Sequence, residues 1–185
     1  KRIKVPIKVL PNFIDYTEVD KHTKLDYILY FGRISKEKGI IQIQSIFDEL
    51  KIPLLIIGDG PEVKNIKQSE NISFLGPKYG KELFKYIAEA RLVIQPSIWY
   101  ENCPMTIIES FANSTPVIGS DHSGFKELIT SGYNGFLMNF ESNNIADQIN
   151  AIYKTSKNKL YSENAKKTYL ENFTKDSHVT TMVDI

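Results

Sequence analysis

Glu101 and Glu109 stand at the two ends of the stretch ENCPMTIIE, and their spacing suits chemistry on a polyol or an anion. Pro104 favours the first position of a helix, which would put Glu101 in the preceding loop and Glu109 in the second turn. Because helical side chains lean toward the N-terminus, both carboxylates are expected to face one loop edge. Glu109 is suited to accept hydrogen bonds from the adjacent hydroxyls of a ribose, and Glu101 to lie beside a sugar or a developing positive charge. The stretch alone leaves an alternative open, in which Glu101 complements the helix dipole and Glu109 points to water.

A second loop, GRISKEKG at residues 32–39, carries the cations Arg33 and Lys38. It is not a phosphate-binding Walker loop, because Gly39 follows the lysine, and it lacks the GxGxxG dinucleotide pattern. Cations near the start of a helix favour an anion, and a diphosphate would suit both. The alternative is that both are solvated surface charges, as single charges usually are.

Apolar runs alternate with helical patterns along the chain. The expected strands lie at 26–32, 53–61, 71–76, 91–97, 115–121 and 135–140. The expected helices lie at 40–50, 80–90, 144–153 and 161–171. Strands that are apolar throughout and separated by helices predict an α/β fold with a Rossmann-like, doubly wound parallel sheet. The loops that follow the strands then share one edge of the sheet, where ligands of such folds bind.

The bulk composition excludes several classes of protein. A chain of 185 residues suits one domain, and a net charge of +1 does not indicate a nucleic-acid partner. The single cysteine, Cys103, cannot form an internal disulfide. No apolar run is long enough for a transmembrane helix. There is no Asp-x-Asp pair, and the histidines lack ligand spacing, so no metal is expected. His122 is interpreted as a polar loop residue.

Seven segments together resemble a known family. In chain order they are VLPNFID (9–15), YFGRISKEKG (30–39), LLIIGDGP (54–61), ISFLG (72–76), VIQPS (93–97), ENCPMTIIES (101–110) and TPVIGSDHSGFKELI (115–129). Over residues 9–137 the chain resembles the C-terminal half of a retaining glycosyltransferase of the GT-B fold, family 4. The two glutamates match the E-x7-E motif of that family. The motif is weak alone, but its order with the arginine–lysine loop is specific.

The resemblance implies a nucleotide-diphosphate sugar as donor, most simply a UDP-sugar, and roles for individual residues. The residues implied at the donor diphosphate are Arg33, Lys38, Met105 and Thr106, the last two through backbone N–H groups. Glu109 would bind the ribose. The residues implied at the donor sugar are Glu101, Asn102, Cys103 and Pro104, with Glu101 as the catalytic residue. Those implied near the base are Gly76, Lys78 and Tyr79. Neither a metal nor a cofactor is implied, and the transferred hexose would keep its anomeric configuration.

The resemblance also implies how the chain is organised. Residues 1–185 would form a single nucleotide-sugar-binding domain, with an interdomain connection and first strand at about 1–25, a core at 26–140 and C-terminal helices at 141–185. The resemblance implies that an N-terminal acceptor-binding domain lies outside these residues, so we expect this half to bind nucleotide weakly and to transfer nothing by itself. The location expected is cytoplasmic. The basic residues at the N-terminus and at 154–175 suit a membrane surface with a lipid-linked acceptor, or equally a solvated charged face.

Two departures from the family pattern change expected contacts. Pro104 replaces a common glycine and removes one N–H group, although Cys103 and Pro104 occur together in some surface-polysaccharide enzymes of this type. Phe13 replaces a glycine in the commoner PNG.

The roles of two aromatic residues and the overall function have alternatives. Trp99 and Tyr100 are expected to pack, or alternatively to stack on a sugar or meet a partner domain. The alternative functions are a GT-B epimerase or phosphorylase, and a nucleotide-binding module without catalysis.

Overall fold

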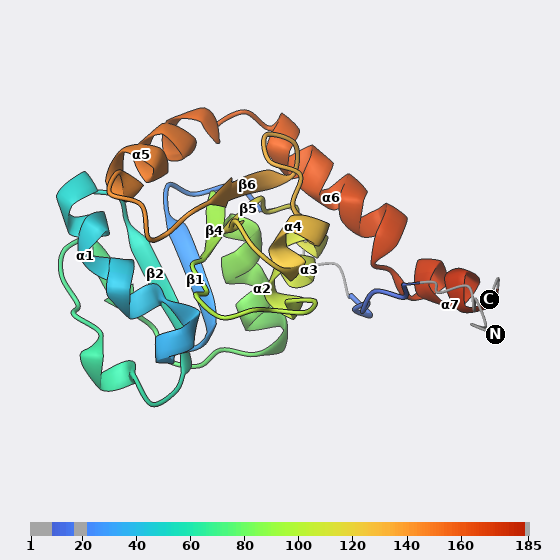
Figure 1. Cartoon of the computed structure of the whole chain (residues 1–185), viewed down its shortest axis with the longest axis horizontal. Helices are drawn as coiled ribbons and strands as arrows, with labels where there is room; N and C mark the ends of the chain where they lie inside the picture. The colour runs from blue at the N-terminus through green and yellow to red at the C-terminus, as the bar shows by residue number, and fades with distance from the viewer. Residues whose placement is uncertain (1–8, 17–21, 184–185) are drawn as a thin grey trace, which may run out of the picture.

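A computed structural model describes residues 9–16 and 22–183. Its centre is a six-stranded sheet with strand order β3-β2-β1-β4-β5-β6, in which every neighbouring pair is parallel (Figure 1). The strands are β1 (Ile28–Arg33), β2 (Leu54–Asp59), β3 (Ile72–Phe74), β4 (Leu92–Gln95), β5 (Val117–Ser120) and β6 (Gly135–Met138). The chain builds outward from β1 in one direction and then from β4 in the other. The winding therefore reverses between β1 and β4, which is the switch point at which such sheets bind ligands.

The described residues also form seven α-helices and two 3-10 turns, of which all but α7 connect or cover the strands. The α-helices are α1 (Ile40–Leu50), α2 (Gly80–Glu89), α3 (Met105–Ala112), α4 (Gly124–Leu128), α5 (Ile145–Thr155), α6 (Leu160–Asn172) and α7 (Lys175–Val183). The 3-10 turns are η1 (Lys36–Lys38) and η2 (Val63–Asn65). The expected alternation of strands and helices is thus confirmed.

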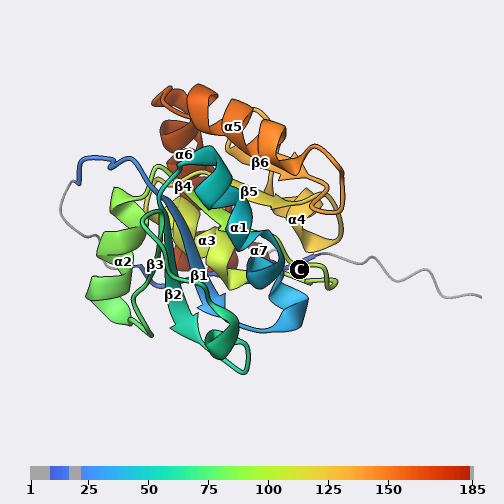
Figure 2. The ribbon, with the colours of Figure 1, turned by 90° about the vertical axis from the view of Figure 1, so that its left-hand side faces the viewer.

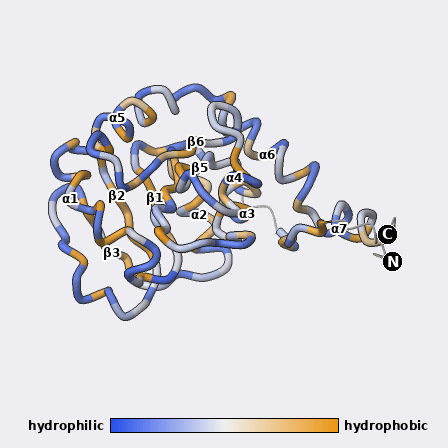
Figure 3. The backbone as a smooth tube through the Cα atoms, viewed as in Figure 1, coloured by the Kyte–Doolittle hydropathy of each residue, from blue (hydrophilic) through white to orange (hydrophobic). Residues whose placement is uncertain are grey.

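The sheet is buried on both faces because successive residues of each strand point to opposite layers. Tyr30 packs in one cluster with Phe47 of α1 and other residues of α1 and α5. Phe31, the next residue, packs in the other cluster with Phe111 of α3 and with residues of α2, α4 and α6. Figure 2 shows the helices on the two sides of the sheet, and Figure 3 shows hydrophobic residues concentrated in the strands.

The structure differs from the sequence-based expectation in four elements. Helix α3 begins at Met105, so Pro104 is its N-cap and not its first residue. Helices α4 and α7 were not expected: α4 has only five residues, and α7 has no buried residue and hence no apolar stripe. The strand expected within residues 1–25 is not found in the described part of that range, 9–16 and 22–25. The other residues of that range, 1–8 and 17–21, lie outside the described chain.

The segment at residues 9–16 packs against the end of the chain. The backbone N–H of Ile14 donates to the carbonyl of Phe173 (3.3 Å), and the Nδ1 atom of His178 lies 2.9 Å from the carbonyl oxygen of Pro11. This segment and α7 lie side by side, away from the sheet, at the right of Figure 1. The elements that precede β1 and follow α6 are therefore tied to each other.

Candidate functional site

The loops after β1 and β4 touch at the switch point because a glycine allows it. Gly39 has φ +76°, and a Cβ atom there would lie 2.0 Å from the carbonyl oxygen of Pro96. Two hydrogen bonds hold the contact: the Ile98 N–H donates to the Glu37 carbonyl (2.9 Å), and the Ser97 hydroxyl donates to the same oxygen (3.1 Å). The contact brings the lysine of one loop to the first glutamate of the other.

Lys38 and Glu101 form an ion pair at this contact. The Lys38 Nζ atom lies 2.5 Å from Glu101 Oε1, and both side chains are partly buried. The Ser97 hydroxyl lies 3.2 Å from the same carboxylate oxygen. Lys38 and Glu101 thus neutralise each other in this structure, and Lys38 does not stand beside Arg33 as a second unpaired cation. An anion that reached Lys38 would compete with Glu101 for it.

The loop after β5 fixes the backbone of Glu101. The Glu101 N–H donates to the Ser123 hydroxyl (3.1 Å), and the Gly124 N–H donates to the Glu101 carbonyl (2.9 Å). A Cβ atom at Gly124 would lie 2.1 Å from the Asn102 carbonyl oxygen, so only glycine permits this approach. The first glutamate of the motif is therefore held by the main chain as well as by its side chain.

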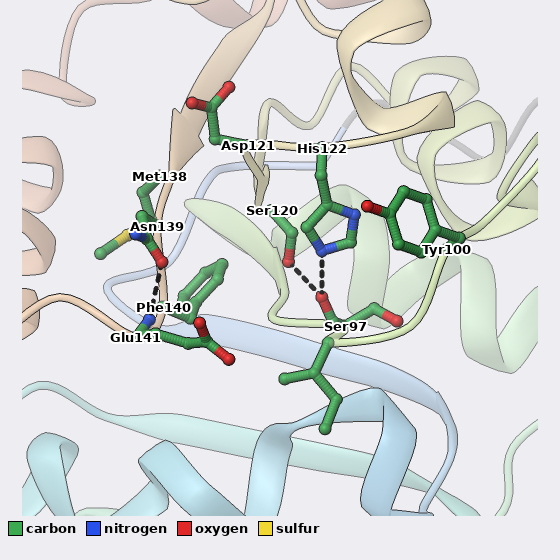
Figure 4. Close-up of a pocket in the computed structure, with 10 residues that line it drawn as sticks. Ser97, Tyr100, Ser120, Asp121, His122, Met138, Asn139, Phe140 and Glu141 are labelled. Carbon is green, nitrogen blue, oxygen red and sulfur yellow. Dashed lines mark hydrogen bonds between the residues drawn. The ribbon is translucent and has the colours of Figure 1, made fainter.

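His122 supports the same loop from the side of β5 (Figure 4). Its Nε2 atom lies 2.9 Å from the Ser97 carbonyl oxygen, and the Ser120 hydroxyl donates to that oxygen as well (2.6 Å). Since a carbonyl can only accept, Nε2 carries the proton. These residues line a cavity of about 290 Å³ that Tyr100 borders. His122 acts here as a structural hydrogen-bond donor within the loops that position Glu101.

Glu109 lines a different cavity, of about 270 Å³, on the other side of the switch point. Its lining includes Gly32, Arg33, Lys78, Tyr79, Thr106 and Glu109. Burial raises the pKa of the Glu109 carboxyl to about 7. Arg33 is exposed and has no salt-bridge partner in the part of the chain that the structure describes. The cavity therefore combines a carboxyl group that titrates near neutrality with a cation free to bind an anion.

The first turn of α3 opens at the same place. Its N-cap, Pro104, provides no side-chain hydrogen bond, so the N–H groups of Met105 and Thr106 have no capping partner. The Thr106 Cγ2 atom would lie 3.7 Å from a Cβ atom built on Gly32, which shows how closely the helix start approaches β1. Free N–H groups and the helix dipole make this an anion-binding position.

The predicted site residues thus fall into two groups and a remainder. Arg33, Thr106, Glu109, Lys78 and Tyr79 surround one cavity, and Lys38 pairs with Glu101 next to it. Cys103 packs against the hydrophobic core, Pro104 is buried and Asn102 is exposed. Gly76 does not line the cavity, although its carbonyl accepts from the Gly58 N–H (3.1 Å).

Two features of the site were not predicted from the sequence. Asp59, the last residue of β2, lines the cavity with Glu109, and its side chain accepts from the Gly60 N–H (2.7 Å). In the sequence this aspartate stands in GDGP, a glycine turn in which aspartate is an ordinary residue. Ser123 was also missed as the hydroxyl that holds Glu101, and no local pattern announces that role.

The fold and this site define a doubly wound α/β protein with a place for an anion and a polyol at its switch point. Residues 15–168 match the sequence model of the family described as "Glycosyl transferases group 1". The chain belongs to that family. The resemblance to the nucleotide-binding half of GT-B glycosyltransferases is thereby confirmed, and membership of family 4 stays a prediction.

Curated relatives from bacteria are similar over part of their length. An uncharacterised 41.2 kDa protein in the cps region of Klebsiella pneumoniae is 32% identical over 121 residues, which are 63% of this chain and 34% of that protein. A GDP-mannose-dependent alpha-mannosyltransferase of Corynebacterium glutamicum is 33% identical over 110 residues, 59% of this chain and 26% of that protein. The chain thus spans about a third or less of the length of these relatives.

A solved structure shows the same fold. The Anabaena protein HepE, crystallised in complex with UDP, superposes with a TM-score of 0.71 at 23% identity, covering 86% of this chain and 48% of that one. In the part of this chain that is described, no helix is both long and apolar enough to cross a membrane. The same residues contain no group of three or more metal-ligating side chains.

Proposed function

We propose that this chain binds the nucleotide-sugar donor of a glycosyltransferase beside the switch point, between the ends of β1, β2 and β3 and the start of α3. The observation that carries the proposal is the convergence of Arg33, Glu109 and the open start of α3 on one cavity. The family match and the names of the relatives support it, since one relative is GDP-mannose-dependent and the HepE structure contains UDP. The family match does not favour the epimerase or the non-catalytic module.

Each end of a nucleoside diphosphate has complementary groups at the cavity. Glu109, when ionised, accepts hydrogen bonds from both ribose hydroxyls. Lys78 and Tyr79 border the base, and Tyr79 is 77% exposed, which leaves its ring free to cover a ligand. The diphosphate lies over the α3 start, where the N–H groups of Met105 and Thr106 and the Arg33 guanidinium donate to it.

Glu101 contributes to the transfer step beside the donor sugar. As the diphosphate binds, its oxygens compete for Lys38, and the carboxylate of Glu101 loses its counter-ion next to the anomeric carbon. A carboxylate there stabilises the positive charge that develops on the sugar ring, while Lys38, Arg33 and the helix N–H groups stabilise the leaving diphosphate. In this proposal neither step requires a metal, and the transferred hexose keeps its configuration, as family 4 membership would imply.

Transfer also needs an acceptor site, which we assign to a further, N-terminal domain that closes on this edge of the sheet. The relatives are long enough to contain such a domain. A glycan or a lipid-linked sugar at a membrane surface is the acceptor class we propose. Because nucleotide sugars are mostly cytosolic, we assign the cytoplasm, including its membrane face, as the location.

Calorimetric titration of the folded chain with UDP, GDP, ADP and dTDP in the presence of EDTA tests the donor site. We expect selective binding of one nucleotide, weakened about tenfold or more by Glu109→Ala, because a lost charge-assisted hydrogen bond costs about 1.5–3 kcal/mol. Glu49→Ala, an exposed carboxylate of α1, is the matched control and should bind normally. Binding that Glu109→Ala leaves unchanged, or no binding at all, would contradict the proposal.

A further inference from the structure

A second cavity, of about 850 Å³, lies at the opposite edge of the sheet. Asp26 and Arg91, which lie just before β1 and β4, line it, as does Ser114, which precedes β5. The other side is formed by the turn between α5 and α6 and by the first turn of α6. None of the residues assigned to the nucleotide lines this cavity, so it is a separate site.

Lys24 is the unusual residue of this cavity because it is a withdrawn cation without a counter-ion. Its Nζ atom donates to the hydroxyl of the buried Thr115 (2.5 Å), which in turn donates to the Ile87 carbonyl. No carboxylate lies within salt-bridge distance of Lys24 among the described residues. Burial alone lowers the pKa of Lys24 to about 7. A bound anion would remove the electrostatic cost of this arrangement.

The remaining charges of the cavity leave it positive. Asp26 is neutralised by an ion pair with Arg91, whose guanidinium also lies over the Tyr153 ring, 3.9 Å from its centroid. His22 contacts Glu89 (3.5 Å). Among the described residues, the lining cations without a salt-bridge partner are Lys24, Lys157 and Lys159, and the one lining carboxylate without a salt-bridge partner is Glu163.

Neutral donors complete the set. Ser162 in the first turn of α6 and Ser114 both line the cavity, and neither hydroxyl has a hydrogen-bond partner among the described residues. The positive end of the dipole of α6, a helix of 13 residues, faces the same space. Ammonium groups, free hydroxyls and a helix start are the groups that proteins use to bind phosphate.

We propose that this cavity binds the phosphate group of a small soluble molecule, with Lys24 at its base and Lys157 and Lys159 at its rim. The site lies across the sheet from the nucleotide cavity and does not depend on the proposed transferase function. The phosphate of a lipid headgroup offers the same chemistry. We choose the soluble ligand because Lys24, the unpaired cation, is withdrawn from the surface, whereas a headgroup site would rest on the exposed rim lysines.

Amide chemical shifts during titration with inorganic phosphate at about pH 6.5, against sodium chloride of equal ionic strength, test the proposal, since charged Lys24 predominates below its pKa. We expect saturable shifts at the amides of Lys24, Thr115 and Ser162. Lys24→Met keeps the length of the side chain and removes the charge, and should weaken this binding about tenfold or more. Lys154→Met, an exposed lysine of α5 outside the cavity, is the matched control and should leave it unchanged.

If Lys24→Met does not fold, the exposed pair Lys157→Gln and Lys159→Gln replaces it and should weaken the same curve severalfold. The proposal would be overturned if phosphate changed the amide shifts of only the loop after β1. It would also be overturned if Lys24→Met left the phosphate titration curve unchanged. A third arm uses phosphatidylcholine vesicles containing phosphatidic acid. Sedimentation with these vesicles, without saturable shifts from inorganic phosphate, would assign the site to a lipid headgroup and contradict the soluble ligand.

Discussion

At the scale of single residues, the site contains two glutamates in different environments. Glu101 is paired with Lys38 and hydrogen-bonded through its backbone, whereas the Glu109 carboxyl lies in a cavity whose burial raises its pKa to about 7. A protonated carboxyl accepts hydrogen bonds less well than a carboxylate. The ribose role of Glu109 is therefore strongest above neutrality.

The raised pKa of Glu109 predicts a pH dependence of stability. The folded state holds this proton up to about pH 7, and the unfolded state releases it near pH 4.5, so the folded state binds more protons between these values. The free energy of unfolding should therefore contain a contribution that is full below about pH 4.5 and is lost as the pH rises to about 7. Urea unfolding across this range should show a shallower decline for Glu109→Gln than for the unchanged chain. Parallel curves for the two would contradict the assigned environment.

The Lys38–Glu101 pair predicts opposite effects of two substitutions on nucleotide affinity. Lys38→Met removes a cation from the diphosphate and should weaken binding about tenfold. Glu101→Gln removes the competitor for Lys38 and should leave binding equal or up to a few times tighter. Calorimetry with the preferred nucleotide measures both. A Glu101→Gln variant that binds much more weakly would show that Glu101 holds the nucleotide itself.

Sequence patterns identified most of these residues but did not predict that Lys38 pairs with Glu101. The motif and its resemblance singled out Arg33, Lys38, Glu101 and Glu109. The contact of Lys38 with Glu101 spans 63 positions and exists because two loops meet, which no local pattern encodes. Asp59 was missed because a single acidic residue in a glycine turn reads as turn chemistry.

At the scale of elements, the site is built by close approach between loops. Gly39 is the clearest example, because a Cβ atom there would lie 2.0 Å from the Pro96 carbonyl oxygen. Periodicity predicted the strands and the long helices because they bury continuous stripes. It could not predict α4, with five residues, or α7, with no buried residue.

The packing of Gly39 predicts a large effect of a single methyl group. Gly39 and Gly132 have nearly equal φ angles, +76° and +79°. A Cβ atom at Gly39 would clash with the Pro96 carbonyl oxygen, whereas a Cβ atom at Gly132 would have no neighbour within 4 Å. Gly132→Ala should cost about 1–2 kcal/mol from backbone strain alone. Gly39→Ala should cost clearly more and should also weaken nucleotide binding, because the loop with Lys38 must move. Equal losses in urea unfolding would contradict the close contact as the cause.

At the scale of the whole molecule, the described residues form one sheet with a proposed donor site at one edge and a proposed phosphate site at the other. The fold class could be predicted from continuous apolar strands alternating with helices. The cavity at the far edge could not be predicted, because its residues come from four separate segments of the sequence.

At the same scale, we predict that this chain binds a nucleotide without transferring a sugar. The 185-residue chain should bind a nucleotide but should transfer no sugar from UDP-glucose or GDP-mannose to an added acceptor, because transfer is proposed to require the acceptor domain. Product analysis by mass spectrometry measures this, with free nucleoside diphosphate as the second readout. Efficient transfer by this chain alone would show that the acceptor site is already contained in it.

The central claim is that a nucleoside diphosphate binds between the ends of β1, β2 and β3 and the start of α3. Amide shift mapping with the nucleotide that binds best tests it most directly, because it reports position as well as affinity. We predict saturable shifts at Gly32, Arg33, Lys78, Thr106 and Glu109, with little change around Lys24. Shifts confined to the Lys24 cavity, or none at the start of α3 at saturation, would contradict the account.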